Sequence, residues 1–216
     1  MLKHQSIFLF VIIIGLVACH RGKSPEGLPK FKQEFKTQIA SFEKQKERAN
    51  KQVNTSLESL SALQQALQDA KNVDKEFAAV YGKWEKVNKR VKHLNKEYED
   101  LRKKADNLFA AITRQIESLS DDKTKKQLTE ALAKSREEYN ETLKNTSKAI
   151  EKLRGLHAEA VDIVKSLEAA VAIGQIAQIN QGLKNIESRV ADIMDELSVT
   201  VKESKALYAK KMGSAS

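Results

Sequence analysis

Apolar side chains recur every three or four residues along almost the whole chain after residue 30, and this spacing restricts the fold more than any other feature. Steps that alternate between four and three residues have a mean period of about 3.5, the period of a helix in a coiled coil. Four such series occupy residues 35–70, 80–119, 128–170 and 179–207. Each series predicts one long helix with a single apolar seam. The chain has only 8 Gly and 2 Pro in 216 residues, which agrees with long helices.

The second and third series define most of the predicted core. The second series consists of Val80, Trp84, Val87, Val91, Leu94, Tyr98, Leu101, Ala105, Leu108, Ile112, Gln115 and Leu119. The third series consists of Leu128, Leu132, Ser135, Tyr139, Thr142, Thr146, Ala149, Leu153, Leu156, Ala160, Ile163, Leu167 and Ala170. In the first series, Lys46 and Ser56 occupy seam positions and predict weak points in the core.

Short polar breaks separate the series and predict where the helices begin and end. Asp74 is the expected N-cap of the second helix, because its carboxylate can accept hydrogen bonds from free N–H groups. Ser120 or Asp121 is the expected N-cap of the third helix. Gly174 is the favoured last break, since glycine takes a positive φ readily, and residues 180–182 are the alternative.

Helices joined by such short turns must run antiparallel to their neighbours. The sequence therefore predicts an all-α chain: an elongated, coiled-coil-like, antiparallel four-helix bundle over residues 30–209, followed by a flexible tail at 210–216. Pro29 suits the first turn of the first helix, where its missing N–H is no loss. Pairing around the second turn places Trp84 opposite His157.

The N-terminus has the layout of an export signal. Lys3 precedes an uncharged apolar stretch at residues 7–18, and a helix of these twelve residues is about 18 Å long. The hydrocarbon core of a bilayer is about 30 Å thick, so the stretch predicts a cleaved signal rather than a permanent span. It ends in Leu16-Val17-Ala18-Cys19, which resembles the lipobox of bacterial lipoproteins at all four positions.

This resemblance implies that residues 1–18 are a lipoprotein signal peptide, cut between Ala18 and Cys19, and that the only cysteine carries acyl lipid. The alternative is an ordinary signal peptide cut at a small residue, which would leave an exposed thiol open to oxidation. Residues 19–29 hold both prolines and predict a flexible tether. His20 is not the aspartate that retains lipoproteins at the inner membrane. The implied location is the cell envelope, and the outer membrane facing the periplasm in a Gram-negative host.

Three stretches of the body carry a second resemblance: Asn95-Lys96-Glu97-Tyr98-Glu99, Ala105-Asp106-Asn107-Leu108-Phe109, and residues 174–197. Across residues 81–208 the layout resembles an uncharacterised bacterial family of long coiled-coil proteins with a domain of unknown function. The resemblance implies a helical bundle and assigns no activity, cofactor or functional residue.

The residues that usually carry chemistry do not form a recognisable constellation in the sequence. His93 falls on a solvent-facing heptad position, and His157 lies beside a seam, where packing against Trp84 is favoured over a ligand role. No spacing of His, Cys and acidic residues is typical of a metal site, and there is no Gly-rich phosphate loop or nucleophile with a partner base. We therefore expect no enzyme activity, no metal and no cofactor.

Two groups of seam residues have a structural and a functional interpretation. Trp84, Tyr81 and Tyr98 are expected in the core rather than in a ligand box. The polar residues Ser135, Thr142 and Thr146 are expected to form a thin part of the core, with a partner groove as the alternative; all six positions are given in the sequence.

The formal charge is +9, and loss of Lys3 with the signal leaves +8. Lys and Glu alternate nearly everywhere, which favours a solvated helix surface over a nucleic-acid site. The expected function is a membrane-anchored envelope lipoprotein that acts as a structural spacer or protein-interaction module, with a protein partner in the envelope. The alternative is a binder of anionic lipid or cell-wall polymer. Its contact residues would be Lys83, Lys86, Lys89, Arg90 and Lys96, on the outside of the second helix.

Overall fold

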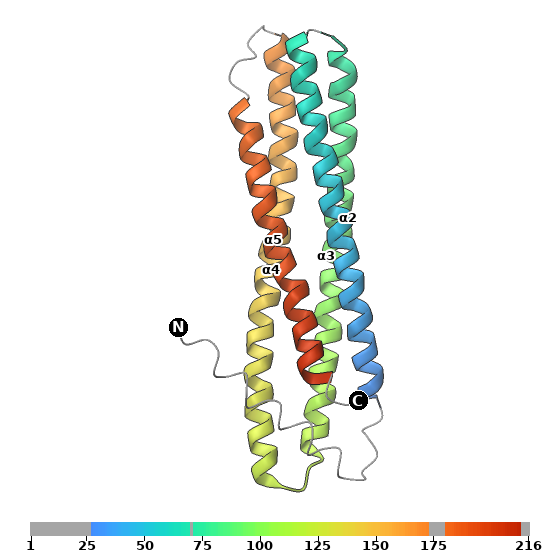
Figure 1. The fold of residues 1–216 in the computed structure, drawn as a ribbon, viewed down its shortest axis with the longest axis vertical. Helices are drawn as coiled ribbons and strands as arrows, with labels where there is room; N and C mark the ends of the chain where they lie inside the picture. The colour runs from blue at the N-terminus through green and yellow to red at the C-terminus, as the bar shows by residue number, and fades with distance from the viewer. Residues whose placement is uncertain (1–26, 70, 173–179, 213–216) are drawn as a thin grey trace. The chain divides into compact units, whose positions relative to one another are not determined.

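The computed structural model describes residues 27–69, 71–172 and 180–212, and these residues are almost entirely α-helical. Four helices follow one another along the chain (Figure 1): α2 Leu28–Asp69, α3 Val73–Glu117, α4 Asp122–Ala172 and α5 Asn180–Met212. No strand occurs in the described ranges. The prediction of an all-α chain with four helices is therefore confirmed.

Local sequence explains where the first two helices begin. Gly27 precedes α2 with φ 117°, a conformation that side chains disfavour, and its carbonyl accepts the N–H of Phe31 at 2.9 Å. Asn72 precedes α3 with φ 56°, in the left-handed region that Asn tolerates better than most residues. The predicted cap at Asp74 is wrong, because α3 already starts at Val73 and Asp74 lies inside its first turn. A carboxylate there still favours the helix by facing its N-terminal partial charge.

The start of α4 follows the prediction. Asp121 Oδ2 accepts the N–H of Thr124 at 2.8 Å, and the Asp121 carbonyl accepts the N–H of Lys125 at 2.9 Å. Hydrogen bonds from the side chain and the main chain of Thr124 hold the pKa of Asp121 below its usual value. The sequence allowed either Ser120 or Asp121 as the N-cap of α4, and the structure shows that Asp121 is the N-cap.

Several predicted boundaries shift. The alternative turn at residues 180–182 is wrong, since these residues belong to α5, while Gly174 lies outside the described residues. Leu28 and Pro29, assigned to the tether, begin α2. Residues 210–212, assigned to the tail, end α5.

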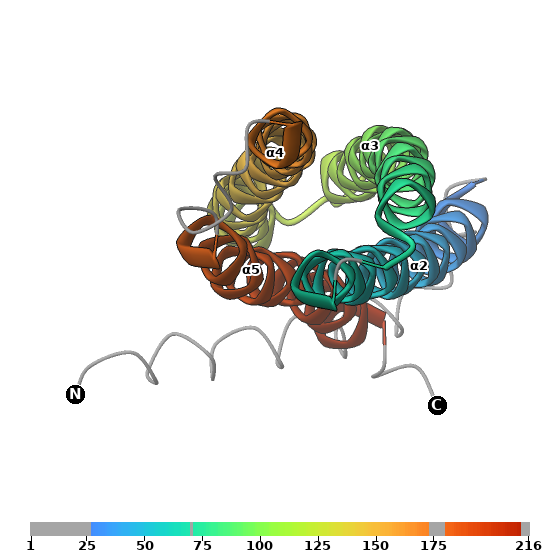
Figure 2. The same ribbon diagram turned by 90° about the horizontal axis from the view of Figure 1, so that it is seen from above.

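The chain divides into two compact units, each built from segments of all four helices. Among the described residues, unit 1 comprises residues 27–41, 99–144 and 199–212, and unit 2 comprises residues 42–69, 71–98, 145–172 and 180–198. In unit 2, Lys152 pairs with Glu196 and Glu159 pairs with Arg189, so residue numbers rise along α4 while they fall along α5. Lys46 of α2 bonds Ser198 of α5, Gln52 of α2 donates to the Lys83 carbonyl of α3, and Tyr81 of α3 donates to Glu168 of α4. Each helical segment of unit 2 therefore has two neighbours, in the order seen from above (Figure 2).

Unit 1 has the same order of neighbours. Lys104 of α3 pairs with Glu34 of α2 at 2.8 Å, and Asp106 of α3 pairs with Arg136 of α4 at 3.2 Å. The Lys36 ammonium of α2 lies 5.7 Å from the ring centre of Tyr208 in α5. Each unit is thus a packed antiparallel bundle of four helical segments.

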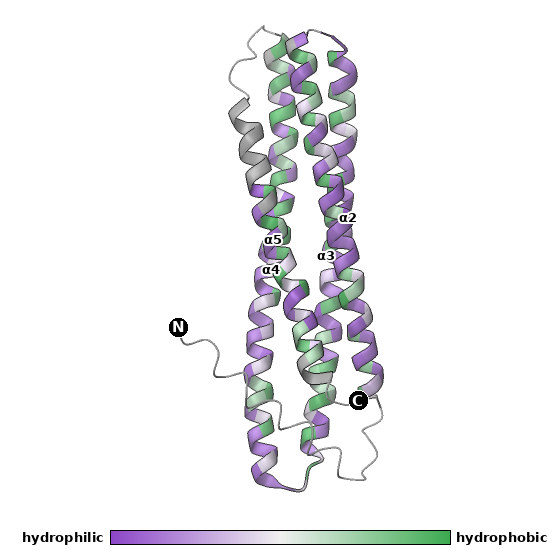
Figure 3. Ribbon diagram, viewed as in Figure 1, coloured by the Kyte–Doolittle hydropathy of each residue, from purple (hydrophilic) through white to green (hydrophobic). Residues whose placement is uncertain are grey.

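The predicted seams form the core of both units. All seam positions from Val80 to Leu108 are buried, and apolar and polar bands alternate along α2, α3 and α4 (Figure 3). Ser56 is also buried and donates to the carbonyl of Gln52, whereas Lys46 is half-buried.

The seam deviates from strict heptads at several places in α3 and α4. Near the end of α3 the buried residues are Phe109, Ala111 and Ile116, and the predicted Ile112, Gln115 and Leu119 are half-buried. In α4, Leu143 and Val164 are buried next to the half-buried Thr142 and Ile163. A straight helix has 3.6 residues per turn, so a stripe with a period of 3.5 drifts around it, and the buried face moves to an adjacent residue.

Candidate functional site

The five basic residues that were predicted to contact an anionic surface lie together along α3 within unit 2. Lys86, Lys89 and Lys96 are exposed, and Lys83 and Arg90 are half-buried. We call these five residues the α3 basic surface. His93 is exposed between Lys89 and Lys96, as its heptad position predicted. Spacings of three and four residues place these side chains on one side of the helix.

Some basic side chains of the described helices lie beside carboxylates. Arg102 lies 3.3 Å from Glu99, and Arg154 lies 2.9 Å from Glu151. Within the described ranges, no member of the α3 basic surface forms an ion pair. Glu85 is nevertheless exposed beside Lys86, and its charge lowers the local positive potential. The surface offers several cations to an anionic partner.

The aromatic group divides between core and surface. Trp84 is 1% exposed and Tyr98 4%, so both belong to the core as predicted. The Trp84 and His157 rings lie next to each other, tilted by 53° with centroids 6.5 Å apart, which confirms the pairing predicted from the turn. Trp84 Nε1 and His157 Nε2 are buried without a hydrogen-bond partner in the described part of the protein. The prediction that Tyr81 belongs to the core is wrong, because Tyr81 is half-buried and lines a pocket away from this pair.

Burial lowers the pKa of His157, and the charge of Lys92 acts in the same direction, while Glu85 and the main chain of Trp84 oppose the shift. The folded protein thus favours the neutral imidazole relative to the unfolded chain, whose histidine pKa is about 6.5. The contribution of His157 to the free energy of unfolding is fully present above about pH 6.5. It decreases as the pH falls from about 6.5 toward the lowered pKa, by at most about 1.4 kcal/mol per pH unit.

We therefore expect the free energy of unfolding of wild type to fall on acidification below pH 6.5, and that of His157→Gln to fall less. Trp84 is the only tryptophan, so its fluorescence during denaturant unfolding reports on this site directly. His93→Gln, at an exposed position, is the matched control and should keep the wild-type pH dependence. Identical pH profiles for wild type and His157→Gln would contradict the assignment.

The polar residues of the third series do not act as one group. Thr146 is buried in unit 2, and Ser135 and Thr142 are half-buried in unit 1, where Thr142 donates to the Glu138 carbonyl at 3.3 Å.

Unit 1 contains a buried polar contact that the sequence analysis did not identify. The Tyr139 hydroxyl and Ser204 Oγ lie 3.0 Å apart, and the Phe35 and Phe109 rings surround Tyr139 at centroid distances of 6.0 and 6.2 Å. Both Tyr139 and Ser204 occupy seam positions, so the heptad spacing indicated that each side chain would be buried. Their pairing required the alignment of α4 with α5.

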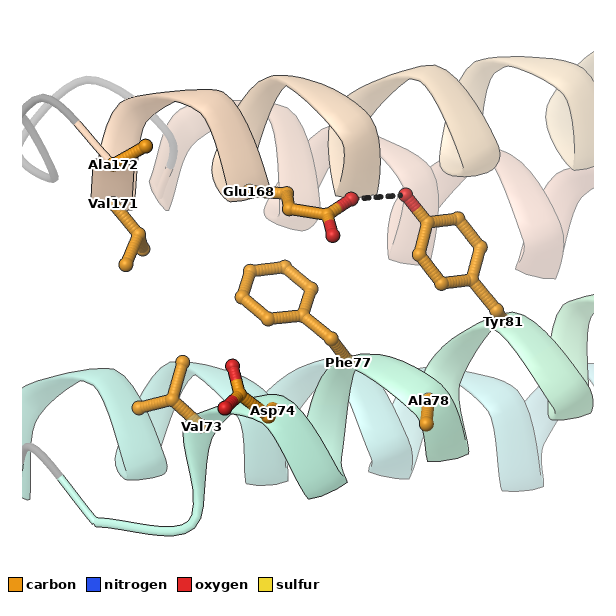
Figure 4. A pocket seen from close by; sticks show the side chains of 8 residues that line it. All are labelled: Val73, Asp74, Phe77, Ala78, Tyr81, Glu168, Val171 and Ala172. Atoms are coloured by element: carbon orange, nitrogen blue, oxygen red, sulfur yellow. Dashed lines mark hydrogen bonds between the residues drawn. The ribbon is translucent and has the colours of Figure 1, made fainter.

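A pocket of about 430 Å³ opens between the start of α3 and the end of α4 in unit 2 (Figure 4). Its lining consists of Val73, Asp74, Phe77, Ala78, Tyr81, Glu168, Val171 and Ala172. The Tyr81 hydroxyl donates to Glu168 Oε2 at 3.0 Å. Burial raises the pKa of Tyr81, and the hydrogen bond to Glu168 raises it further, so Tyr81 remains a neutral donor at neutral pH. The spacing of Phe77 and Tyr81 indicates that they share one face of α3. The sequence could not show that Glu168 would lie beside them, because it is distant in the chain.

In residues 27–69, 71–172 and 180–212, no cluster of three His, Cys, Asp or Glu side chains could hold a metal ion. None of the helices in these ranges is long and apolar enough to span a bilayer. Ala18 and Cys19, the predicted cleavage and lipidation residues, lie outside the described residues.

The family described as "Protein of unknown function (DUF2959)" matches residues 28–212, the four helices of the structure. No curated protein and no solved structure is similar enough to the chain to match it.

Proposed function

This chain belongs to the DUF2959 family of proteins of unknown function, and we propose that it is a lipid-anchored protein of the bacterial cell envelope. In this proposal it is a structural spacer or protein-interaction module, and it catalyses no reaction. The observation that carries the proposal is the segment Leu16-Val17-Ala18-Cys19, at the end of an apolar stretch and ahead of a helical body. Two or more acyl chains on Cys19 would hold that body firmly at a membrane, at about 0.8 kcal/mol per buried methylene.

The way in which the body uses its polar side chains supports an interaction role. Tyr139 and Ser204 bond each other inside unit 1, and Ser56 bonds a carbonyl of its own helix, so these hydroxyls serve packing. The outer helix faces carry exposed charged side chains, such as Lys89 and Lys148. Such a surface suits recognition of another protein by complementary charge more than it suits chemistry on a small substrate.

Photo-crosslinking in intact envelopes tests this role. A photoreactive residue at the exposed positions Lys89 and Lys148 of the full chain should give an adduct with the same envelope protein in independent preparations. The Cys19→Ala variant should lose that adduct, because its body would lack the acyl anchor that places it beside the partner. Adducts that persist unchanged in Cys19→Ala, or a protein found entirely outside the membrane fraction, would contradict the proposal.

A second candidate function is binding of an anionic lipid surface or cell-wall polymer. The observation that favours it is the α3 basic surface, whose five cations form no ion pair within the described residues. Each basic side chain near an anionic membrane contributes about 1 kcal/mol. The attraction between exposed charges is screened beyond about 8 Å at physiological salt.

Reversal of three of these charges, Lys86→Glu, Lys89→Glu and Arg90→Glu together, should reduce vesicle binding by more than about tenfold. The measurement is co-sedimentation of the unlipidated body with phosphatidylglycerol vesicles, at low and at physiological salt. Circular dichroism should show unchanged helicity, since the three side chains are exposed or half-buried.

The matched control reverses three exposed lysines of α4, namely Lys126, Lys134 and Lys148, and changes the net charge equally. It should bind more tightly than the α3 variant. Equal binding by wild type and the α3 variant would exclude the basic surface as the contact. Equal losses in both variants would show that only total charge matters.

A further inference from the structure

The pocket between α3 and α4 combines aromatic walls with negative charge. Phe77 and Tyr81 project from successive turns of α3 toward α4, and Glu168 reaches toward them from α4 (Figure 4). Phe77 is 6% exposed, so its ring forms the floor of the pocket, and Val73 and Val171 add apolar surface at the side. A volume of about 430 Å³ is within the range of sites that hold small organic molecules.

Two features give the pocket a preference for positive charge. Asp74 and Glu168 are the charged residues of its lining, and both are acids. Glu168 uses Oε2 to accept from Tyr81, which leaves Oε1 without a hydrogen-bond partner among the described residues. The lining also includes the last turn of α4, which carries no basic side chain, and the negative partial charge of this helix end opposes the positive partial charge at the first turn of α3.

We propose that this pocket binds a small organic cation, an amine that carries an apolar or aromatic group. The ammonium would lie against Glu168 and the face of the Phe77 ring, where the carboxylate and the ring quadrupole both attract it. The apolar group would contact Val73 and Val171. The hydrogen bond from Tyr81 already restrains the Glu168 carboxylate, so binding would cost little side-chain conformational entropy. The proposal is independent of the lipid anchor and adds a ligand to the proposed interaction module.

The test is a titration of the full chain, kept soluble in a non-ionic detergent, with 2-phenylethylammonium as the probe. NMR signals of the Phe77 and Tyr81 rings should shift in a saturable manner. The neutral isostere 2-phenylethanol should bind about three- to fivefold more weakly, the scale expected from an exposed charge contact combined with a cation–π contact.

Glu168→Gln keeps an acceptor for Tyr81 but removes the charge, and should reduce the preference for the amine over the alcohol to the smaller part that the Phe77 ring contributes. Glu130→Gln, on the exposed surface of α4 in unit 1, is the matched control and should leave binding unchanged. The proposal is overturned if the Phe77 and Tyr81 signals do not saturate, which includes the case in which another part of the chain fills the pocket. It is equally overturned if amine and alcohol bind alike, or if Glu130→Gln weakens binding as much as Glu168→Gln.

Discussion

Leu153→Asp is expected to unfold the helices of unit 2. Leu153 is 1% exposed on the α4 seam, and a carboxylate in its place would be buried without a partner. Burial of an unpaired charge costs several kcal/mol, and a loss above about 4 kcal/mol is a large part of the stability of most domains. Circular dichroism during heating and denaturant titration should therefore show lost helicity or a much earlier transition.

Leu101→Asp tests the same reasoning in unit 1, where Leu101 is fully buried. Asn145→Asp is the matched control for Leu153→Asp, since it places the same carboxylate on the same helix at an exposed position. Glu99→Ala removes one half-exposed ion pair with Arg102 and should cost less than about 1 kcal/mol. If Leu153→Asp kept the transition of Asn145→Asp, the predicted seam would not be the core of unit 2.

Cys19→Ala is expected to abolish lipidation and to leave the chain as an uncut precursor. The thiol is the only group at this site to which a diacylglycerol could be joined, and no second cysteine exists to replace it. Without acyl chains the body would lose the anchoring energy of about 0.8 kcal/mol per buried methylene. Mass spectrometry of the wild type should find an N-terminus at Cys19 with acyl mass, and membrane fractionation should find the variant body no longer anchored through lipid.

Ser24→Ala is a suitable control, because it changes a tether residue outside the lipobox and should leave processing normal. A wild-type N-terminus at any other residue, without acyl mass, would favour an ordinary signal peptide and leave Cys19 as a free thiol. The result bears on location alone, since the helices begin at Leu28.

The heptad spacing was sufficient to predict the helices because seam burial repeats along each one. The series from Val80 to Leu108 is buried without exception, and the cap at Asp121 is a local hydrogen bond to Thr124. The pairing of Trp84 with His157 also followed from sequence, because a short turn determines which positions of two antiparallel helices meet. The lipobox at Cys19 stays a prediction of the sequence.

Other features depended on how the helices pack against each other in the folded protein. The period of 3.5 could not show that Leu143 and Val164 would be buried beside Thr142 and Ile163, because the drift of a real helix depends on its neighbours. The same holds for contacts between helices whose residues are distant in sequence. Tyr139 meets Ser204, and Tyr81 meets Glu168, only after α4 has aligned with its partners. The sequence by itself therefore determined which residues form helices and most of each buried face, since both depend on local spacing. The pocket of Phe77 and Glu168 was decided by tertiary structure, because its two walls come from different helices.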